Sequence, residues 1–210
     1  MILSVETSTR AFSISFGKSH TEVIASVEII HEIAHSQNIV GSVKFLLNSV
    51  NARVSDISSV YAGIGPGSFT GIRIGLSFAN TMLQTMGIPL LGIPSLDLLA
   101  FEEGRWYNPV IPFIKSRKNE VYTASYDNGE RTSDYLSLKL EDFRKFIEER
   151  SPRYLISSEE DFRAFFPHSA ELEAQRLVSF PKSRVALSYA EECGLKPDMR
   201  YLKPLYVRDF

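Results

Sequence analysis

Apolar and polar positions divide the first hundred residues into strand-like runs and helix-like periods. Four runs predict strands, because they are either continuously apolar or alternate between apolar and polar residues: residues 1–5, 12–16, 21–29 and 58–62. A helical apolar period covers residues 39–50. Residues 72–86 are apolar or small almost throughout, and this pattern predicts a central helix that is buried on every side.

The same pattern repeats more weakly in the second half of the chain. Glu102-Glu103-Gly104-Arg105 is a polar interruption, and we expect a first domain over 1–103 and a second over 104–210. The second half has a strand set, an amphipathic helix and a last helix closed by glycine: 110–115, 121–126, 135–138, 140–149, 153–156 and 183–193. It contains no second glycine- and aspartate-rich phosphate loop, so we expect a reduced half.

Between the strand over 58–62 and the central helix lies a glycine-rich turn, residues 63–75. Gly65 and Gly67 flank Pro66, which lets the chain turn steeply, and Ser68 is suited to cap the helix. Neither the dinucleotide fingerprint nor the P-loop pattern fits this spacing. Farther along, Gly71, Gly75 and Ala79 form a stripe of small residues, which predicts close contact with another helix, in this chain or in a partner.

Three stretches resemble the bacterial TsaB family, also called YeaZ. They are Gly65-Pro66-Gly67-Ser68-Phe69-Thr70-Gly71-Ile72-Arg73-Ile74-Gly75, the opening Ile2-Leu3-Ser4-Val5-Glu6-Thr7-Ser8-Thr9, and Asn119-Glu120-Val121-Tyr122. The resemblance implies an α/β actin-like ATPase (ASKHA) fold with two RNase H-like halves. It also implies a part in making threonylcarbamoyladenosine in tRNA, beside a TsaD-like catalytic subunit and a TsaE-like ATPase.

The loop after the first strand is a weak nucleotide-site candidate. In actin-like ATPases this loop holds a phosphate, and here it contains Glu6, Thr7, Ser8 and Thr9. The family usually has aspartate where this chain has Glu6, which puts an inherited metal–water geometry in doubt. A hairpin capped by hydroxyl side chains is an equally good interpretation. The resemblance implies no cofactor of the chain's own, and it allows ATP or ADP at the junction with a partner.

The stretch His31-Glu32-Ile33-Ala34-His35 matches the zinc-peptidase pattern. That chemistry needs both histidines on one helix and a third ligand. The apolar period begins only after Ser36, which would cap the helix, so we expect His31 at a strand end and His35 at the helix entry. The metal-binding histidines of the TsaD relative have no counterpart near Ser95-Leu96-Asp97. We therefore predict no metal site.

Composition bears on two questions, the attraction of the chain to nucleic acid and its cellular compartment. The chain has 210 residues, 44% hydrophobic and 23% charged, with a formal net charge of −2, which gives no overall attraction to nucleic acid. One cysteine, Cys193, and the lack of a leader or membrane-spanning run lead us to expect a cytoplasmic protein. The C-terminal tail mixes basic and aromatic residues, and we favour packing over contact with tRNA for it: Lys196, Arg200, Tyr201, Lys203, Tyr206, Arg208 and Phe210.

Three functional hypotheses follow, of which the first is preferred. It is a non-catalytic scaffold that docks a TsaD-like subunit through helices 38–50 and 68–86, forms a homodimer when alone and meets tRNA only through the complex. The second is a zinc peptidase using His31, Glu32 and His35, and the third is a stand-alone ATPase or kinase. For the first we predict that the central helix turns one set of residues toward the partner: Ser68, Phe69, Gly71, Ile72, Gly75 and Ala79.

Overall fold

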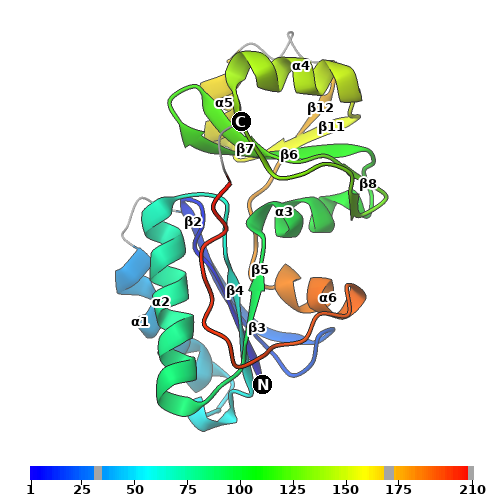
Figure 1. Cartoon of the computed structure of the whole chain (residues 1–210). Coiled ribbons are helices and arrows are strands. Elements are labelled where there is room, and N and C mark those ends of the chain that lie inside the picture. Colours follow the sequence, from blue (N-terminus) through cyan, green and yellow to red (C-terminus); the bar gives the residue numbers. More distant parts are fainter. Residues whose placement is uncertain (31–34, 168–172, 208–210) are drawn as a thin grey trace. The chain divides into compact units, whose positions relative to one another are not determined.

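The computed structural model describes residues 1–30, 35–167 and 173–207. The chain forms two compact units, one of residues 1–95 with 181–205 and the other of residues 96–180 with 206–210 (Figure 1). The sequence predicts a boundary at 103/104. In the structure the first unit ends at Ser95, and it also includes the late segment Pro181–Leu205.

The first unit is built on a five-stranded sheet in the order β3-β2-β1-β4-β5. Strands β1 to β3 form an antiparallel meander, and β4 and β5 extend it in parallel. Helices α1 and α2 pack on one face of this sheet and α6 on the other (Figure 1). The elements are β1 Ile2–Glu6, β2 Ala11–Gly17, β3 Val23–Ile30, α1 His35–Ser49, a 3-10 turn Val54–Asp56, β4 Ser59–Gly63, α2 Phe69–Met86, β5 Leu90–Ile93 and α6 Val185–Glu192.

The second unit repeats this order as β10-β7-β6-β11-β12, with a small hairpin of β8 and β9 beside β6. Its last helix is reduced, since α5 has 7 residues and the corresponding α2 has 18. The elements are α3 Ser95–Gly104, β6 Val110–Arg117, β7 Glu120–Thr123, β8 Tyr126–Asp127, β9 Glu130–Arg131, β10 Leu136–Lys139, α4 Leu140–Arg150, β11 Tyr154–Ser157, α5 Glu159–Phe165 and β12 Gln175–Val178. The predicted α/β class, with two RNase H-like halves of the actin-like ATPase fold, is confirmed.

Each unit has its own apolar core. In the first, β1 and β2 are buried along their whole length and pack against buried faces of α1 and α2. In the second, Phe113 of β6 lies edge-on to Phe162, with ring centroids 5.1 Å apart, and tilted against Phe143 at 5.3 Å. No helix among the described residues is both long and apolar enough to cross a lipid bilayer.

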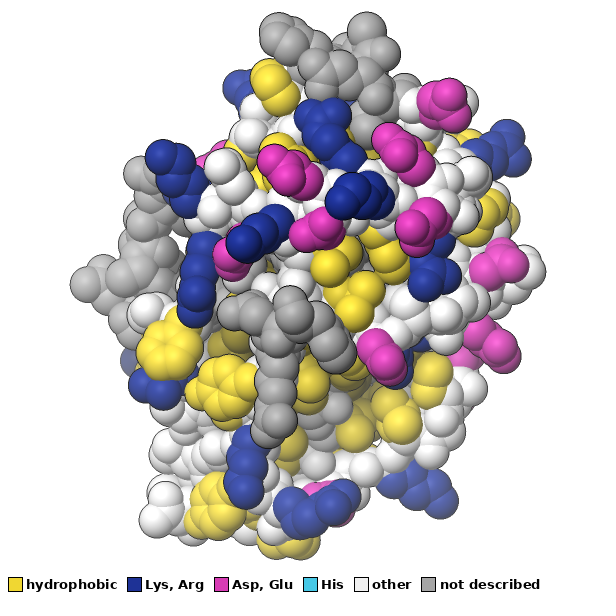
Figure 2. Space-filling view, turned by 45° about the horizontal axis from the view of Figure 1, so that its top comes forward, with side chains coloured by type: hydrophobic (Ala, Val, Ile, Leu, Met, Phe, Trp, Pro, Cys, Tyr) yellow, Lys and Arg dark blue, Asp and Glu magenta, His cyan; other side chains and the backbone are white. Residues whose placement is uncertain are grey.

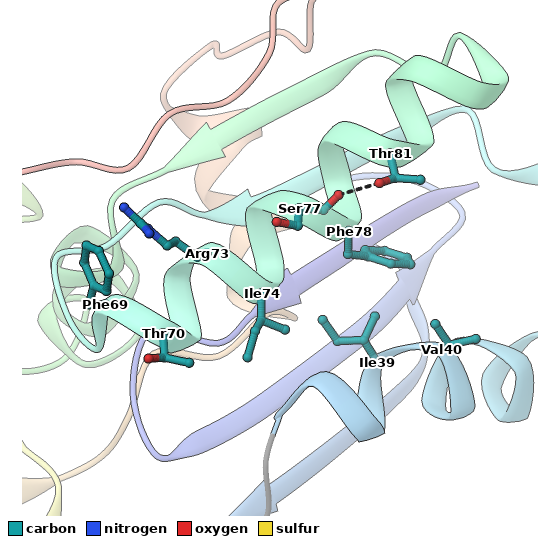
Figure 3. Close-up of a pocket in the computed structure, with 9 residues that line it drawn as sticks. All are labelled: Ile39, Val40, Phe69, Thr70, Arg73, Ile74, Ser77, Phe78 and Thr81. Atoms are coloured by element: carbon teal, nitrogen blue, oxygen red, sulfur yellow. Dashed lines mark hydrogen bonds between the residues drawn. The ribbon is translucent and has the colours of Figure 1, made fainter.

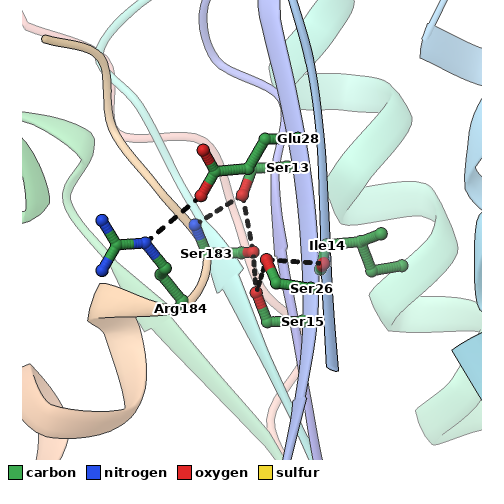
Figure 4. A network of polar contacts seen from close by, with 7 residues as sticks. All are labelled: Ser13, Ile14, Ser15, Ser26, Glu28, Ser183 and Arg184. Carbon is green, nitrogen blue, oxygen red and sulfur yellow. Dashed lines mark hydrogen bonds and ion pairs between the residues drawn. The ribbon is translucent and has the colours of Figure 1, made fainter. Parts of the chain in front are cut away.

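A chain of serine hydroxyls, buried at Ser13, Ser15 and Ser183 and exposed at Ser26, attaches the late segment to the first sheet (Figure 4). Ser183 Oγ lies 2.7 Å from Ser13 Oγ and 2.6 Å from Ser15 Oγ, and Ser15 Oγ lies 3.0 Å from Ser26 Oγ. Ser26 Oγ donates to the Ile14 carbonyl, which fixes the direction of the chain. Because each hydroxyl has one proton, Ser15 donates to Ser26, Ser183 to Ser15 and Ser13 to Ser183.

We expect Ser183→Ala to lower the free energy of unfolding by about 1–3 kcal/mol, because the buried Ser13 hydroxyl loses its acceptor. Urea unfolding of the whole chain measures this. Ser188→Ala is the matched control, since among the described residues the half-buried Ser188 hydroxyl bonds only to Val185 of its own helix. We expect that control to change stability by no more than about 0.5 kcal/mol. Equal effects of the two variants would mean that the serine chain adds nothing to stability.

Candidate functional site

The glycine-rich turn and the β1–β2 loop are packed into one another. The Ser68 N–H donates to the Ser8 carbonyl at 2.6 Å, and the Thr7 hydroxyl donates to the Gly71 carbonyl at 2.8 Å. A Cβ added at Gly67 would lie 2.2 Å from the Ser8 carbonyl oxygen. At the start of α2, Ser68 Oγ accepts from the Gly71 N–H at 3.2 Å, so the predicted N-cap is confirmed.

The predicted outward face of the small-residue stripe is wrong. A Cβ on Gly71 would lie 2.1 Å from the Thr7 carbonyl oxygen, and one on Gly75 would lie 2.5 Å from Thr7 Oγ1. Ala79 is fully buried and Ile72 is 5% exposed. These four residues of α2 therefore face the interior of their own unit, and the close neighbour that the glycines admit is the β1–β2 loop.

Of the predicted interface residues, Ser68 and Phe69 are exposed. The sequence predicts that the central helix is buried on every side, and this prediction is wrong. Thr70, Arg73 and Ser77 are also exposed, and these polar side chains lie on the face of α2 opposite the sheet. The sequence does carry a signal for this face: its polar residues are three or four positions apart, which places them on one side of a helix.

The exposed face of α2 forms one wall of an open groove of about 650 Å³ against α1 (Figure 3). In this view Ile74 and Phe78 point toward Ile39 and Val40 of α1. Two of the apolar side chains are largely open to solvent, Phe69 with 56% and Val40 with 68% of their surface exposed. The groove is lined by Ile39, Val40, Phe69, Thr70, Arg73, Ile74, Ser77, Phe78 and Thr81.

One cation lies at this groove. The Arg73 guanidinium carbon lies 3.7 Å from the centre of the Phe69 ring. Among the described residues Arg73 has no ion pair with a carboxylate. A guanidinium stacked on an aromatic ring can still bind a carboxylate through the N–H groups that lie in its plane. The groove therefore combines an apolar floor with one available cation at its margin.

The weak nucleotide-site candidate is mostly closed. Glu6, Thr7 and Ser8 are 0%, 1% and 0% exposed, and Thr9 is half-buried. Thr9 Oγ1 accepts from the Ala11 N–H at 3.2 Å, a contact inside the hairpin. In this conformation three of the four side chains cannot reach a nucleotide in solvent, because the glycine-rich turn covers them.

Glu6 shows how completely the loop is packed. Its Oε1 accepts from the Ser8 N–H at 2.6 Å and its Oε2 from the Ser95 hydroxyl at 2.9 Å. Gly63 leaves the space for this carboxylate, since a Cβ there would lie 1.9 Å from Oε2. Burial raises the pKa of the Glu6 carboxyl above its ordinary 4.5, against hydrogen bonds from Ser8 and Ser95 that lower it.

A raised pKa in the folded chain gives a definite pH dependence. The folded chain keeps the proton on Glu6 to higher pH than the unfolded chain, so stability falls as pH rises from about 4.5 through the folded-state pKa. Glu6→Gln removes this titration and keeps the shape of the side chain. We expect its free energy of unfolding to fall less over that range than that of the wild type.

The measurement is urea unfolding at a series of pH values, with the two proteins compared at each. Asp161, whose pKa burial also raises, is present in both proteins, so the difference reports Glu6. Glu22→Gln, on an exposed side chain, is the control for a simple change of charge. An unchanged pH slope in Glu6→Gln would show that Glu6 does not titrate differently in the folded chain.

The zinc-peptidase stretch is only partly described. His31 and Glu32 lie outside the described residues, and His35 is the first residue of α1. The helix therefore begins before Ser36, which is not its N-cap. Within the described ranges no group of three histidine, cysteine, aspartate or glutamate side chains is placed to hold a metal ion.

A model of the family described as "TsaD: tRNA N6-adenosine threonylcarbamoyltransferase" matches residues 23–180. The TsaB protein of Bacillus subtilis is 32% identical over 71% of this chain and 66% of its own length. The TsaB protein of Escherichia coli is 33% identical over 61% of this chain and 56% of its own length. The matches thus span less than two thirds of these curated relatives.

A solved structure agrees with the fold. YeaZ from Pseudomonas aeruginosa superposes with a TM-score of 0.80 at 22% identity, covering 98% of this chain and 99% of that one. The likeness extends over both units. From the family model, the chain belongs to the TsaD family, and these two relatives that it resembles in sequence are named TsaB.

Proposed function

We propose that this chain is the non-catalytic scaffold of a tRNA-modifying complex. It supports a TsaD-like subunit that transfers a threonylcarbamoyl group to the adenosine next to the anticodon. The TsaB relatives are named as proteins of threonylcarbamoyladenosine biosynthesis, and this name motivates the reaction. The groove between α1 and α2 motivates the role, because an exposed apolar surface beside an available cation favours a protein partner.

The packing of the β1–β2 loop favours a non-catalytic role for this chain over a catalytic one. A nucleotide-binding carboxylate has to remain ionised and reachable, and Glu6 is buried, with its oxygens engaged by Ser8 and Ser95. The groove, by contrast, is open and apolar. ATP or ADP at the junction with the partner, contact with a TsaE-like ATPase and a location in the cytoplasm are parts of the same proposal.

When the partner is absent, we propose that a second copy of the chain covers the groove as a two-fold dimer. Such an interface is self-complementary, so each copy offers the same helices. Homodimer and heterodimer would then compete for the same surface, and their contact residues would be those of the groove in place of the small-residue stripe.

The experiment is depletion of the chain in its own host, followed by mass spectrometry of nucleosides from bulk tRNA. We expect threonylcarbamoyladenosine to be lost and to return when the wild-type chain is supplied. A tagged chain purified from the same cells should bring down the TsaD-like subunit. An unchanged nucleoside level, or steady ATP turnover by the isolated chain that Thr9→Ala abolishes, would overturn the scaffold proposal.

A further inference from the structure

The segment 196–205 crosses the first unit in an extended conformation and is held by its backbone. Asp198 and Leu90 exchange two backbone hydrogen bonds of 2.7 and 2.9 Å. The Asn80 amide of α2 brackets Leu202, accepting from its N–H at 2.8 Å and donating to its carbonyl at 3.1 Å. The Leu202 side chain packs against the apolar core. The segment is therefore fixed along its inner edge.

These attachments leave the intervening side chains outside. Met199 and Tyr201 have 60% and 57% of their surface exposed. We call the outward residues the basic-aromatic strip: Lys196, Met199, Arg200, Tyr201 and Lys203. Figure 2 shows two kinds of surface: Lys and Arg mixed with Asp and Glu over its upper part, and Lys and Arg beside apolar side chains in its lower part.

The charges of the strip are partly engaged and partly available. Arg200 is bonded to Asp198, with its Nε 2.8 Å from Oδ2. Lys196 and Lys203 form no ion pair with any described residue, and the Tyr201 ring stacks on no described aromatic ring. The strip thus offers two ammonium groups that no described carboxylate neutralises, and one exposed phenol ring, on a fixed backbone.

We propose that the basic-aromatic strip contacts the RNA substrate of the complex, with its lysines on phosphates and Tyr201 stacked on an unpaired base. This inference rests on the proposed function. Aromatic rings bind single-stranded bases through their faces, and lysines bind phosphates by charge. A protein partner fits less well, because lysine is depleted in the centres of protein interfaces. The sequence favours packing for the tail, and within its segment 196–205 the structure shows an inner edge that packs and an outer edge that is exposed.

The test uses the chain assembled with its TsaD-like partner, and an anticodon stem-loop RNA as probe. The dissociation constant is measured by fluorescence anisotropy over a range of salt concentrations. For Lys196→Ala with Lys203→Ala, we expect the slope of log affinity against log salt to fall by between about one and two. Tyr201→Ala should weaken binding about tenfold at all salt concentrations, and Tyr201→Phe should restore it.

The matched control removes two exposed lysines elsewhere, Lys18→Ala with Lys139→Ala, and should leave the salt slope unchanged. Light scattering checks that each variant assembles with the partner. Unchanged RNA binding by complexes that assemble normally would overturn this inference and leave the scaffold role intact. Loss of assembly in the strip variants would also overturn it, since the strip would then be a protein interface. Failure of the wild-type chain to assemble would instead count against the scaffold role.

Discussion

Gly71→Ala is expected to destabilise the chain by about 3 kcal/mol, a large effect for one methyl group. The added Cβ would lie 2.1 Å from the carbonyl oxygen of Thr7 and 3.2 Å from its carbonyl carbon. Both atoms belong to backbone, so no side chain can swing away to make room. The β1–β2 loop or the first turn of α2 would have to shift, and the hydrogen bond from the Thr7 hydroxyl to Gly71 would break.

The same substitution at Gly41 is the control. Gly41 lies inside α1, and a Cβ there would meet nothing within 4 Å. Because alanine favours a helix over glycine, Gly41→Ala should stabilise the chain by about 0.5–1 kcal/mol. Urea unfolding of both variants gives opposite signs if the packing is as described. Wild-type stability for Gly71→Ala would mean that loop and helix are not in contact, and would return the stripe to a partner-facing role.

Most strands of the two sheets are predictable from the sequence, because continuous apolar runs and apolar–polar alternation mark them locally. Phe12, Ile14 and Phe16 alternate with serines in β2, and both kinds of residue prove buried. The serines are buried since the late segment brings Ser183 against them from 170 positions away. No local pattern records a contact of that separation, so the domain boundary at 103/104 missed the return of 181–205 to the first unit.

The short elements of the second unit were missed for a different reason. Strand β12 has four residues at the edge of its sheet, and none of them is fully buried, so it has no alternation to read. Helix α5 has seven residues, fewer than a clear helical period needs. Its start could have been found, because Ser158 followed by Asp161 is a capping pattern, and Ser158 does accept from the Asp161 N–H.

The glycine stripe was recognised from the sequence, and its neighbour was misidentified. Glycines at four-residue spacing show that some backbone or side chain comes close. They carry no information on which one. Here the neighbour is Thr7, 64 positions earlier in the chain, and the exposed face lies opposite, at Arg73 and Ser77. Most of the residues predicted for the interface therefore lie on the buried side of α2, and the exposed groove residues lie on its other side.

Because the groove lies on the exposed side of α2, Ser77 is the position where a substitution tests the proposed interface most directly. Ser77 is an exposed groove residue, and a long side chain there does not disturb the core. Ser77→Arg sets a second guanidinium one helical turn from Arg73, over the apolar floor of Ile74 and Phe78. A partner that covers the groove would have to desolvate both cations with one set of complementary groups.

We therefore expect Ser77→Arg to weaken association with the TsaD-like subunit by about a hundredfold or more, in the range of central interface residues. Calorimetric titration measures the heterodimer, and light scattering of the chain alone measures the homodimer, which should weaken in parallel because both use one groove.

Ser19→Arg makes the same change at an exposed position between β2 and β3 and should leave both associations intact. The thermal melts of the two variants should match the wild type. Wild-type association by a folded Ser77→Arg chain would place the interface elsewhere. Loss of only one association would show that the two partners do not share the groove, and the proposed competition between them would fail.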